Sequence, residues 1–235
     1  MRKRTQCALA ALLSMVLLFC LVPAAGADAP DLDHGKNTVT IGLDSQADFI
    51  EDIVKAKLQA DFYLVAPAAP VAGVDSYSLS LQAPFASAEV RKGVTAAQEL
   101  ETLTKPAETE PKFDDLVSAL FGVVQKDSTV PAPVVAAAVG EAEEIVCTGL
   151  NPGMYMVLIH SSTLTEKSVD AEKGYLKEEY VQPGDPNAEP VKTVVGTRGL
   201  SNAYEYTFKP MLVSVPGILG PDGKTPVFNT TEEGT

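Results

Sequence analysis

The stretch at residues 148–159, with the sequence TGLNPGMYMVLI, is the strongest indication of the fold class of this chain. Asn151, Pro152 and Gly153 predict a tight turn, because proline presets φ at the second turn position and glycine supplies the positive φ that a type II turn needs next. Large apolar and aromatic residues follow at once, from Met154 to Ile159. Such a run, directly after a turn, predicts a buried β-strand.

A second segment of the same character lies at residues 204–216, with the sequence YEYTFKPMLVSVP. The two segments contain the patterns L-x-P-G-x-Y-x-V and Y-T-F-x-P-x-L-V-S-x-P. Together they resemble the prealbumin-like domains of Gram-positive pilins and surface adhesins, the SpaA-like or Cna B-type group. The resemblance implies a mainly β fold, a prealbumin-like antiparallel β-sandwich, and a role at the cell surface that involves no catalysis.

The N-terminus is typical of a secretory signal peptide. Residues 2–4 are basic, residues 8–22 are almost entirely apolar, and an A-x-A motif ends at Ala27. The apolar stretch is short for a membrane span of about 20 residues, so cleavage is favoured over a retained anchor. We expect residues 1–27 to be removed between Ala27 and Asp28.

Charge and cysteine content limit the classes of partner. Removal of residues 1–27 leaves 15 Lys and Arg against 31 Asp and Glu, a formal charge of −16. Such an acidic chain is not expected to bind nucleic acid. Cys147 is then the single cysteine, so no intrachain disulfide can form. Its apolar neighbours predict a small buried side chain.

The remaining chain is expected to hold a flexible lead-in, residues 28–37, and one domain, residues 38–235. Short segments between proline and glycine residues predict its strands, at 38–43, 60–65, 77–82, 191–195 and 204–215. The strand at 60–65 is expected to end at Pro67 and Pro70. Residues 130–139 fit either a strand or a linker, residues 161–190 are expected to be mostly loop, and a turn at 221–224 predicts a return strand from Val227.

Helical patterns interrupt the strands. A short helix is expected after Ser45, and a helical insertion is expected at about residues 94–126. Thr95 and Gln98 have the spacing of a capping box, and a second run has apolar residues at helical intervals, namely Phe113, Leu116, Val117, Leu120 and Val124. The fold we predict is therefore a β-sandwich with inserted helices, against the alternative of an α+β open sheet.

No pattern in the chain predicts catalysis. The two histidines are His34 in the lead-in and His160 at a strand end, and no nucleophile elbow, metal-protease motif or phosphate-binding glycine loop occurs. His160 precedes Ser161, but adjacent side chains of an extended strand point to opposite faces. We expect no enzyme activity, no cofactor and no metal.

The family resemblance implies one covalent reaction. Many SpaA-like domains join a Lys of the first strand to an Asn of the last strand through an amide bond, promoted by a buried acid. The nearest candidates here are Lys36, Asn229 and Glu144. Lys36 precedes the predicted strand, and His160 stands where the acid often stands in the family. These two departures predict that the crosslink does not form.

Two functions are consistent with these features. The first is an exported cell-surface structural or adhesive protein, a pilin-like subunit or adhesin module whose partners are other surface or pilus subunits and host matrix or glycan. The alternative is a freely secreted binding module for host glycan or matrix protein, not anchored to the wall. We expect the domain to be C-terminally incomplete, with sortase a partner only if a further C-terminal segment carries a sorting signal.

Overall fold

The computed structural model describes residues 37–42, 50–70, 77–103, 113–137, 144–183, 188–215, 218–219 and 226–227. The expected signal peptide with its Ala27–Asp28 junction, and the crosslink candidates Lys36 and Asn229, lie outside these residues. Asn37, counted above with the lead-in, belongs to the first strand, and its side-chain amide donates a hydrogen bond to the backbone O of Leu150 at 3.0 Å.

The described residues form strands and helices in the following order. The strands are β1 (Asn37–Gly42), β2 (Leu58–Pro70), β3 (Tyr77–Leu79), β4 (Glu89–Arg91), β5 (Val94–Thr95), β6 (Val134–Ala137), β7 (Glu144–Leu150), β8 (Gly153–Ser161), β9 (Leu176–Val181), β10 (Val191–Leu200), β11 (Glu205–Phe208), β12 (Met211–Val215), β13 (Ile218–Leu219) and β14 (Pro226–Val227). The helices are α2 (Ile50–Lys55), α3 (Ala96–Leu103) and α4 (Phe113–Lys126), with a 3-10 turn at Phe85–Ser87.

The central sheet is built around β8 and β2. These strands pair antiparallel, with Phe62 opposite Val157. β12 pairs with the other edge of β8, and Val213 lies opposite Tyr155. The second edge of β2 is shared by β6 along its first residues and by β3 at its end. Every one of these pairings is antiparallel, which agrees with the predicted class.

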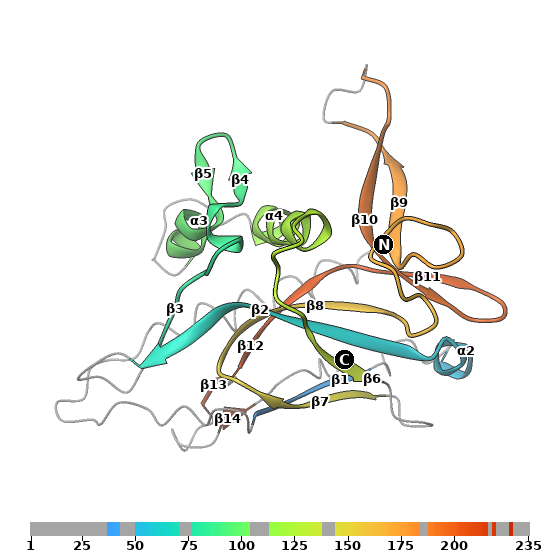
Figure 1. Cartoon of the computed structure of the whole chain (residues 1–235), viewed down its shortest axis with the longest axis horizontal. Helices are drawn as coiled ribbons and strands as arrows, with labels where there is room; N and C mark the ends of the chain where they lie inside the picture. The colour runs from blue at the N-terminus through green and yellow to red at the C-terminus, as the bar shows by residue number, and fades with distance from the viewer. Residues whose placement is uncertain are drawn as a thin grey trace, which may run out of the picture.

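The central sheet is covered on both faces (Figure 1). Helices α3 and α4 lie over one face, and the antiparallel pair β1–β7 lies over the other. Alternation along β8 divides its side chains between the two cores. Met154, Met156 and Leu158 pack with the helices, whereas the intervening residues pack with β1 and β7. This double coverage is why the run at 154–159 is uniformly apolar.

The mainly β, antiparallel class and the inserted helices predicted from sequence are confirmed. The helices α3 and α4 lie within the predicted insertion at 94–126, over one face of a sheet. The backbone N–H of Thr95 donates to Gln98 Oε1 at 2.9 Å, and the N–H of Gln98 donates to Thr95 Oγ1 at 3.4 Å. This reciprocal pair is the capping box that the spacing predicted. All pairings of the central sheet are antiparallel, so the described residues do not form the parallel sheet that would have supported the open-sheet alternative.

Three other predictions have clear outcomes. The ambiguous run at 130–139 contains a strand, β6, and the return strand expected from Val227 is present as β14, paired with β13. Cys147 is buried, as its neighbours predicted. No helix among the described residues is both long enough and apolar enough to cross a membrane.

Two predictions about turns and breaks are wrong. Gly153 has a φ of 159°, close to extended, so it does not provide the φ of about +80° that a type II turn needs. Glycine fits there because an added Cβ would lie 2.7 Å from the backbone O of Ala66. Pro67 does not end β2, which continues to Pro70, the second of the two predicted ends. Ala68 donates its N–H to Pro152 O at 3.0 Å, on the β8 side of β2. The backbone N of the preceding residue, Pro67, points to the opposite edge, where it lies between the part of β2 paired with β6 and the part paired with β3. No strand there requires an N–H donor from residue 67, so proline is tolerated.

Two strands differ from the prediction. The described part of 161–190 is mostly loop, as expected, but it also contains β9, which pairs with β10. The segment at 204–215 is two strands, because the chain leaves one sheet for another at Lys209 and Pro210. β11 pairs with β10, and β12 pairs with β8. Proline has no N–H to donate and therefore suits the break between the two ladders.

Candidate functional site

Of the three crosslink candidates, Glu144 is among the described residues. Glu144 is exposed at the start of β7, opposite Gly42 of β1. His160, at the position where the family often has an acid, has the same parity along β8 as Leu158 and therefore lies on the helix-covered side of the sheet. The strand β1 lies over the opposite face. His160 thus stands on the wrong side of the sheet to act on a first-strand lysine.

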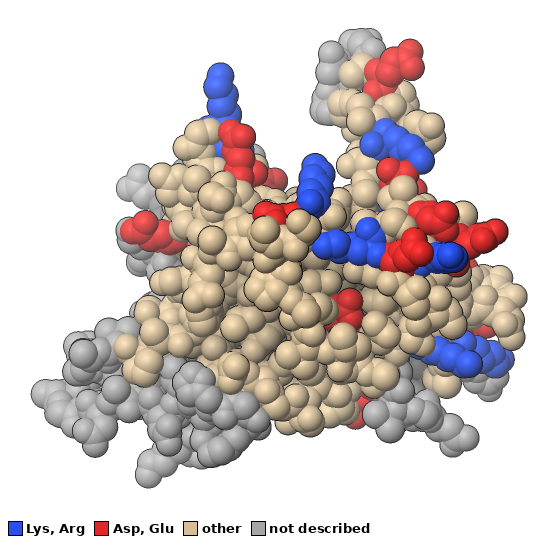
Figure 2. Space-filling view, in the orientation of Figure 1, with Lys and Arg blue, Asp and Glu red and all other residues tan. Residues whose placement is uncertain are grey.

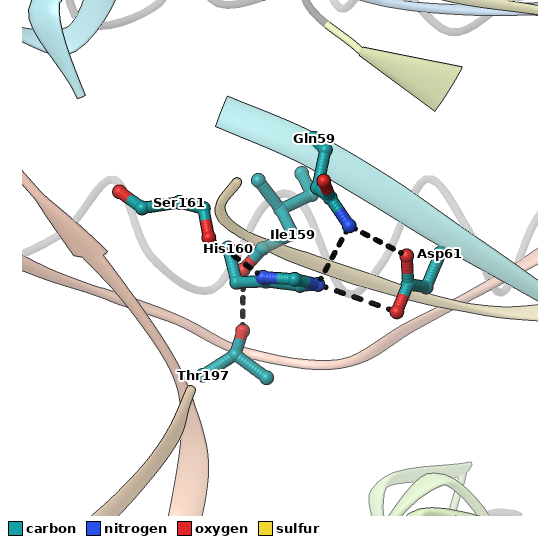
Figure 3. A network of polar contacts seen from close by, with 6 residues as sticks. All are labelled: Gln59, Asp61, Ile159, His160, Ser161 and Thr197. Carbon is teal, nitrogen blue, oxygen red and sulfur yellow. Dashed lines mark hydrogen bonds and ion pairs between the residues drawn. The ribbon is translucent and has the colours of Figure 1, made fainter. Parts of the chain in front are cut away.

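His160 instead belongs to a buried polar network at the end of the β2–β8 ladder (Figure 3). Its Nε2 atom lies 3.2 Å from Asp61 Oδ2 and 3.3 Å from Gln59 Nε2. The Gln59 amide also donates to Asp61 Oδ1 at 3.2 Å. His160 is only 2% exposed and Asp61 only 5%, so their hydrogen-bond partners are protein groups, and bulk water has little access to them.

Both nitrogens of the His160 ring have polar partners. Nδ1 lies 2.9 Å from the backbone O of Ser161, an acceptor to which an Nδ1–H donates. Nε2 lies beside both the Asp61 carboxylate and the Gln59 amide. The ring is therefore held at both ends.

Ser161 points away from His160, which confirms the prediction for adjacent residues of a strand. Its hydroxyl donates to the backbone O of Ala56 at 2.6 Å and accepts the N–H of Leu200 at 2.7 Å. Thr197, also in β10, donates from its hydroxyl to the backbone O of Ile159 at 2.5 Å. These bonds connect β10 to the end of β8 through Ile159 and Ser161, the two residues that flank His160 in the chain (Figure 3).

Two tyrosines complete the network. The ring of Tyr175 stacks on His160, with 4.1 Å between the ring centroids and 15° between the planes. Tyr63, in β2, is hydrogen-bonded to Tyr175 through the side-chain hydroxyls. Burial raises the pKa of both phenols, so both stay protonated and neutral at physiological pH.

The network lines a hollow of about 290 Å³, called the His160 hollow below. Its lining consists of the network residues Gln59, Asp61, Tyr63, His160 and Tyr175, called the floor, and of Pro133, Val135, Ser162, Leu164, Thr165 and Lys167. Val135 lies directly opposite Asp61 in the β6–β2 ladder, which explains why the two side chains share this face. The hollow therefore combines a polar floor with a partly apolar wall.

A folded loop, residues 162–175, makes the outer wall. The guanidinium of Arg198 donates to the backbone O of Ala171 at 3.0 Å, and the N–H groups of Glu172 and Lys173 donate to Asp170 Oδ1, each at 2.9 Å. Gly174 packs so closely that an added Cβ would lie 2.3 Å from the backbone O of Ser168. These contacts give the loop a defined shape before any ligand arrives.

A second candidate surface is the ribbon formed by β9 and β10, which extends away from the body (Figure 1). Tyr180 is 73% exposed and Val191 is 57% exposed, and Val181, opposite Val191, is also exposed. Lys192 pairs with Glu178 on the same ribbon. Figure 2 shows acidic and basic side chains mixed on the ribbon and around its base, whereas the body below is mostly uncharged in this view.

Comparison with family models, with curated proteins and with solved structures gives no match for this chain. The family resemblance therefore depends on the sequence motifs described above. Among the described residues, no group of three or more His, Cys, Asp or Glu side chains is placed to hold a metal ion.

Sequence reasoning singled out His160 but missed its partners Gln59, Asp61 and Tyr175. One signal was present, because Asp61 is the single charged residue in the otherwise apolar segment 60–65. A carboxylate in a buried strand must be paired, since an unpaired buried charge is too costly. The identity of the partner could not be read from sequence, because Asp61 and His160 are 99 residues apart.

Proposed function

We propose that this chain is an exported structural or adhesive protein of a Gram-positive cell surface, built on a prealbumin-like, SpaA-like domain. The motifs at 150–157 and 206–216 and the N-terminal signal pattern support the family and the location. The observation that carries the adhesive role is the β9–β10 ribbon, which presents Tyr180, Val181 and Val191 to solvent. Val181 and Val191 are paired on one face of the ribbon, and Tyr180 lies on the other face. Exposed apolar side chains on both faces of a projecting element suit a surface for protein contact.

Export is tested by expressing residues 1–235 in a Gram-positive host and separating cytoplasm, cell wall and medium. N-terminal sequencing is expected to give a product that begins at Asp28, in the wall or medium fraction. A product confined to the cytoplasm that still begins at Met1 would refute the proposal.

Adhesion is tested with beads coated with the purified chain. The surfaces are collagen, fibronectin, fibrinogen and cell walls purified from the Gram-positive expression host. We expect adhesion to at least one surface, and we expect Tyr180→Ser combined with Val191→Ser to weaken it strongly. Val169→Ser is the matched control, because Val169 is also an exposed valine but lies outside the ribbon. Equal loss in both variants would remove the ribbon from the proposal.

The second candidate function is a freely secreted binding module for glycan or matrix protein. The observation that favours it is the His160 hollow, a concave site whose polar groups are already held in place by one another. Recovery of the mature chain from the medium, together with saturable binding of a soluble ligand, would favour this candidate over a wall-bound subunit.

A further inference from the structure

We propose that the His160 hollow binds one neutral sugar ring of a glycan. This inference rests on the second candidate function, the secreted binding module, and it names the class of ligand. Four properties of the hollow lead to it: its size, its charge, the division of its lining and the stiffness of its frame.

The size favours a small ligand. Pockets for drug-sized molecules have volumes of about 300–1,000 Å³. The His160 hollow, at about 290 Å³, lies at the lower limit of that range. It can therefore take a single ring with its substituents, or the end unit of a chain whose remaining units extend into solvent.

The charge favours a neutral ligand. The lining contains one carboxylate, Asp61, and one ammonium, Lys167, and its two tyrosines, Tyr63 and Tyr175, are protonated. Lys167 is exposed. An anion seated on the floor would meet the Asp61 carboxylate, and a cation would meet the Lys167 ammonium. A neutral, hydroxyl-bearing ligand meets neither repulsion.

The lining matches the two kinds of surface that a sugar ring offers. At the floor, each oxygen of Asp61 has one hydrogen-bond partner among the described residues, Gln59 for Oδ1 and His160 for Oδ2. A carboxylate oxygen can accept more than one hydrogen bond, so capacity remains for ligand hydroxyls. Val135 and Pro133 form an apolar wall beside this floor, suited to the C–H face of a sugar ring.

The frame is fixed before binding. Tyr175 is stacked on His160, β10 is bonded to β8 through Thr197, and Arg198 holds the loop that makes the outer wall. Groups that are already ordered lose little conformational entropy when a ligand arrives. A small, weakly interacting ligand such as one sugar ring benefits most from such a site.

The test is titration of the purified chain with neutral monosaccharides, namely glucose, galactose, mannose, N-acetylglucosamine and N-acetylgalactosamine, followed by calorimetry or NMR. Glucuronic acid and glucosamine serve as charged counterparts. We expect at least one neutral sugar to bind saturably and more tightly than both charged sugars.

A matched pair of variants locates the site. Val135→Glu places a charge on the apolar wall from a residue that is 55% exposed, and Val134→Glu places the same charge on the next residue, which is 43% exposed and does not line the hollow. We expect Val135→Glu to weaken binding by about tenfold or more, because the added carboxylate would be desolvated by the ligand. Val134→Glu should bind like the parent chain. If Val135→Glu does not fold, Thr165→Trp, which fills the rim from an exposed position, replaces it.

Three results would overturn the inference: no binding by any neutral sugar of the panel, equal or tighter binding of a charged sugar, or equal loss in the Val135 and Val134 variants. The export and bead assays are independent of this titration. A chain that is exported and adheres but binds no sugar refutes the sugar site alone, whereas a chain that binds sugar but stays in the cytoplasm refutes the proposed location alone.

Discussion

The two faces of the β2–β8 pair are both buried, but only one of them carries the buried His160–Asp61 contact. The face under β1 and β7 is lined mainly by apolar side chains, including Phe62, Val157 and Ile159. The face under α3 and α4 begins in the same way with Met154 and Met156 and ends in the His160 network. The first face therefore stabilises the fold, and the second also shapes a hollow that a ligand could enter.

The largest expected effect lies on the apolar face. Phe62 is fully buried and makes an edge contact with Tyr155, with ring centroids 6.3 Å apart. We expect Phe62→Ala to lower the free energy of unfolding by about 3–5 kcal/mol, because it removes buried surface and leaves a cavity. Urea denaturation followed by circular dichroism measures this. Val134→Ala, opposite Phe62 but exposed, should change stability by less than about 0.5 kcal/mol. Similar values for the two would contradict the comparison.

The polar end of the other face should behave differently. Asp61→Leu removes the carboxylate partner of the buried His160 Nε2, at an expected cost of about 1–3 kcal/mol. The double variant Asp61→Leu with His160→Leu removes both partners, and we expect it to recover part of that loss. A double-mutant cycle by urea denaturation measures the coupling. Additive losses would mean that the two side chains do not act as a pair.

The capping box of α3 contributes less, because it lies at the exposed start of a helix. We expect Thr95→Ala to lower the free energy of unfolding by about 1 kcal/mol, the usual effect of losing an N-terminal cap. Thr102→Ala is the control, since Thr102 bonds only within the helix, to Gln98 O. A Thr95→Ala variant as stable as the parent chain would show that packing of α3 alone holds the helix.

The smallest effect concerns a polar contact at the margin of the apolar face. A side-chain hydrogen bond from Ser201, followed by one from Tyr206, lowers the pKa of Asp52 below its usual value of 3.8. A lowered folded-state pKa stabilises the fold above the unfolded pKa, and this stabilisation is lost as the pH falls through the folded value. We expect parent and Asp52→Asn chains to differ in melting temperature at pH 7, and we expect this difference to shrink as the pH falls below about 4. A difference that does not change between about pH 4 and about pH 2.5 would contradict this assignment.

Local patterns were sufficient where a segment's environment is simple. Helix α4 follows from its apolar spacing and its terminal charges, and β8 follows from an uninterrupted apolar run. β9 was missed because its sequence, LKEEYV, has two adjacent glutamates, and it becomes a strand through its pairing with β10. The break at Pro210 was missed because both halves of 204–215 have strand propensity, and only the partners of β11 and β12 separate them.

The sequence by itself determined the mainly β class, the helical insertion, the buried strand at 154–159 and the opposite directions of the His160 and Ser161 side chains. These properties depend on periodicity and short-range turn chemistry, which residues near one another in the chain encode. Only the tertiary structure decided which face His160 joins, that Asp61 is its partner, and that Tyr175 and β6 enclose a hollow beside them. Those relations depend on strand register and on packing between distant segments, which a local pattern does not contain.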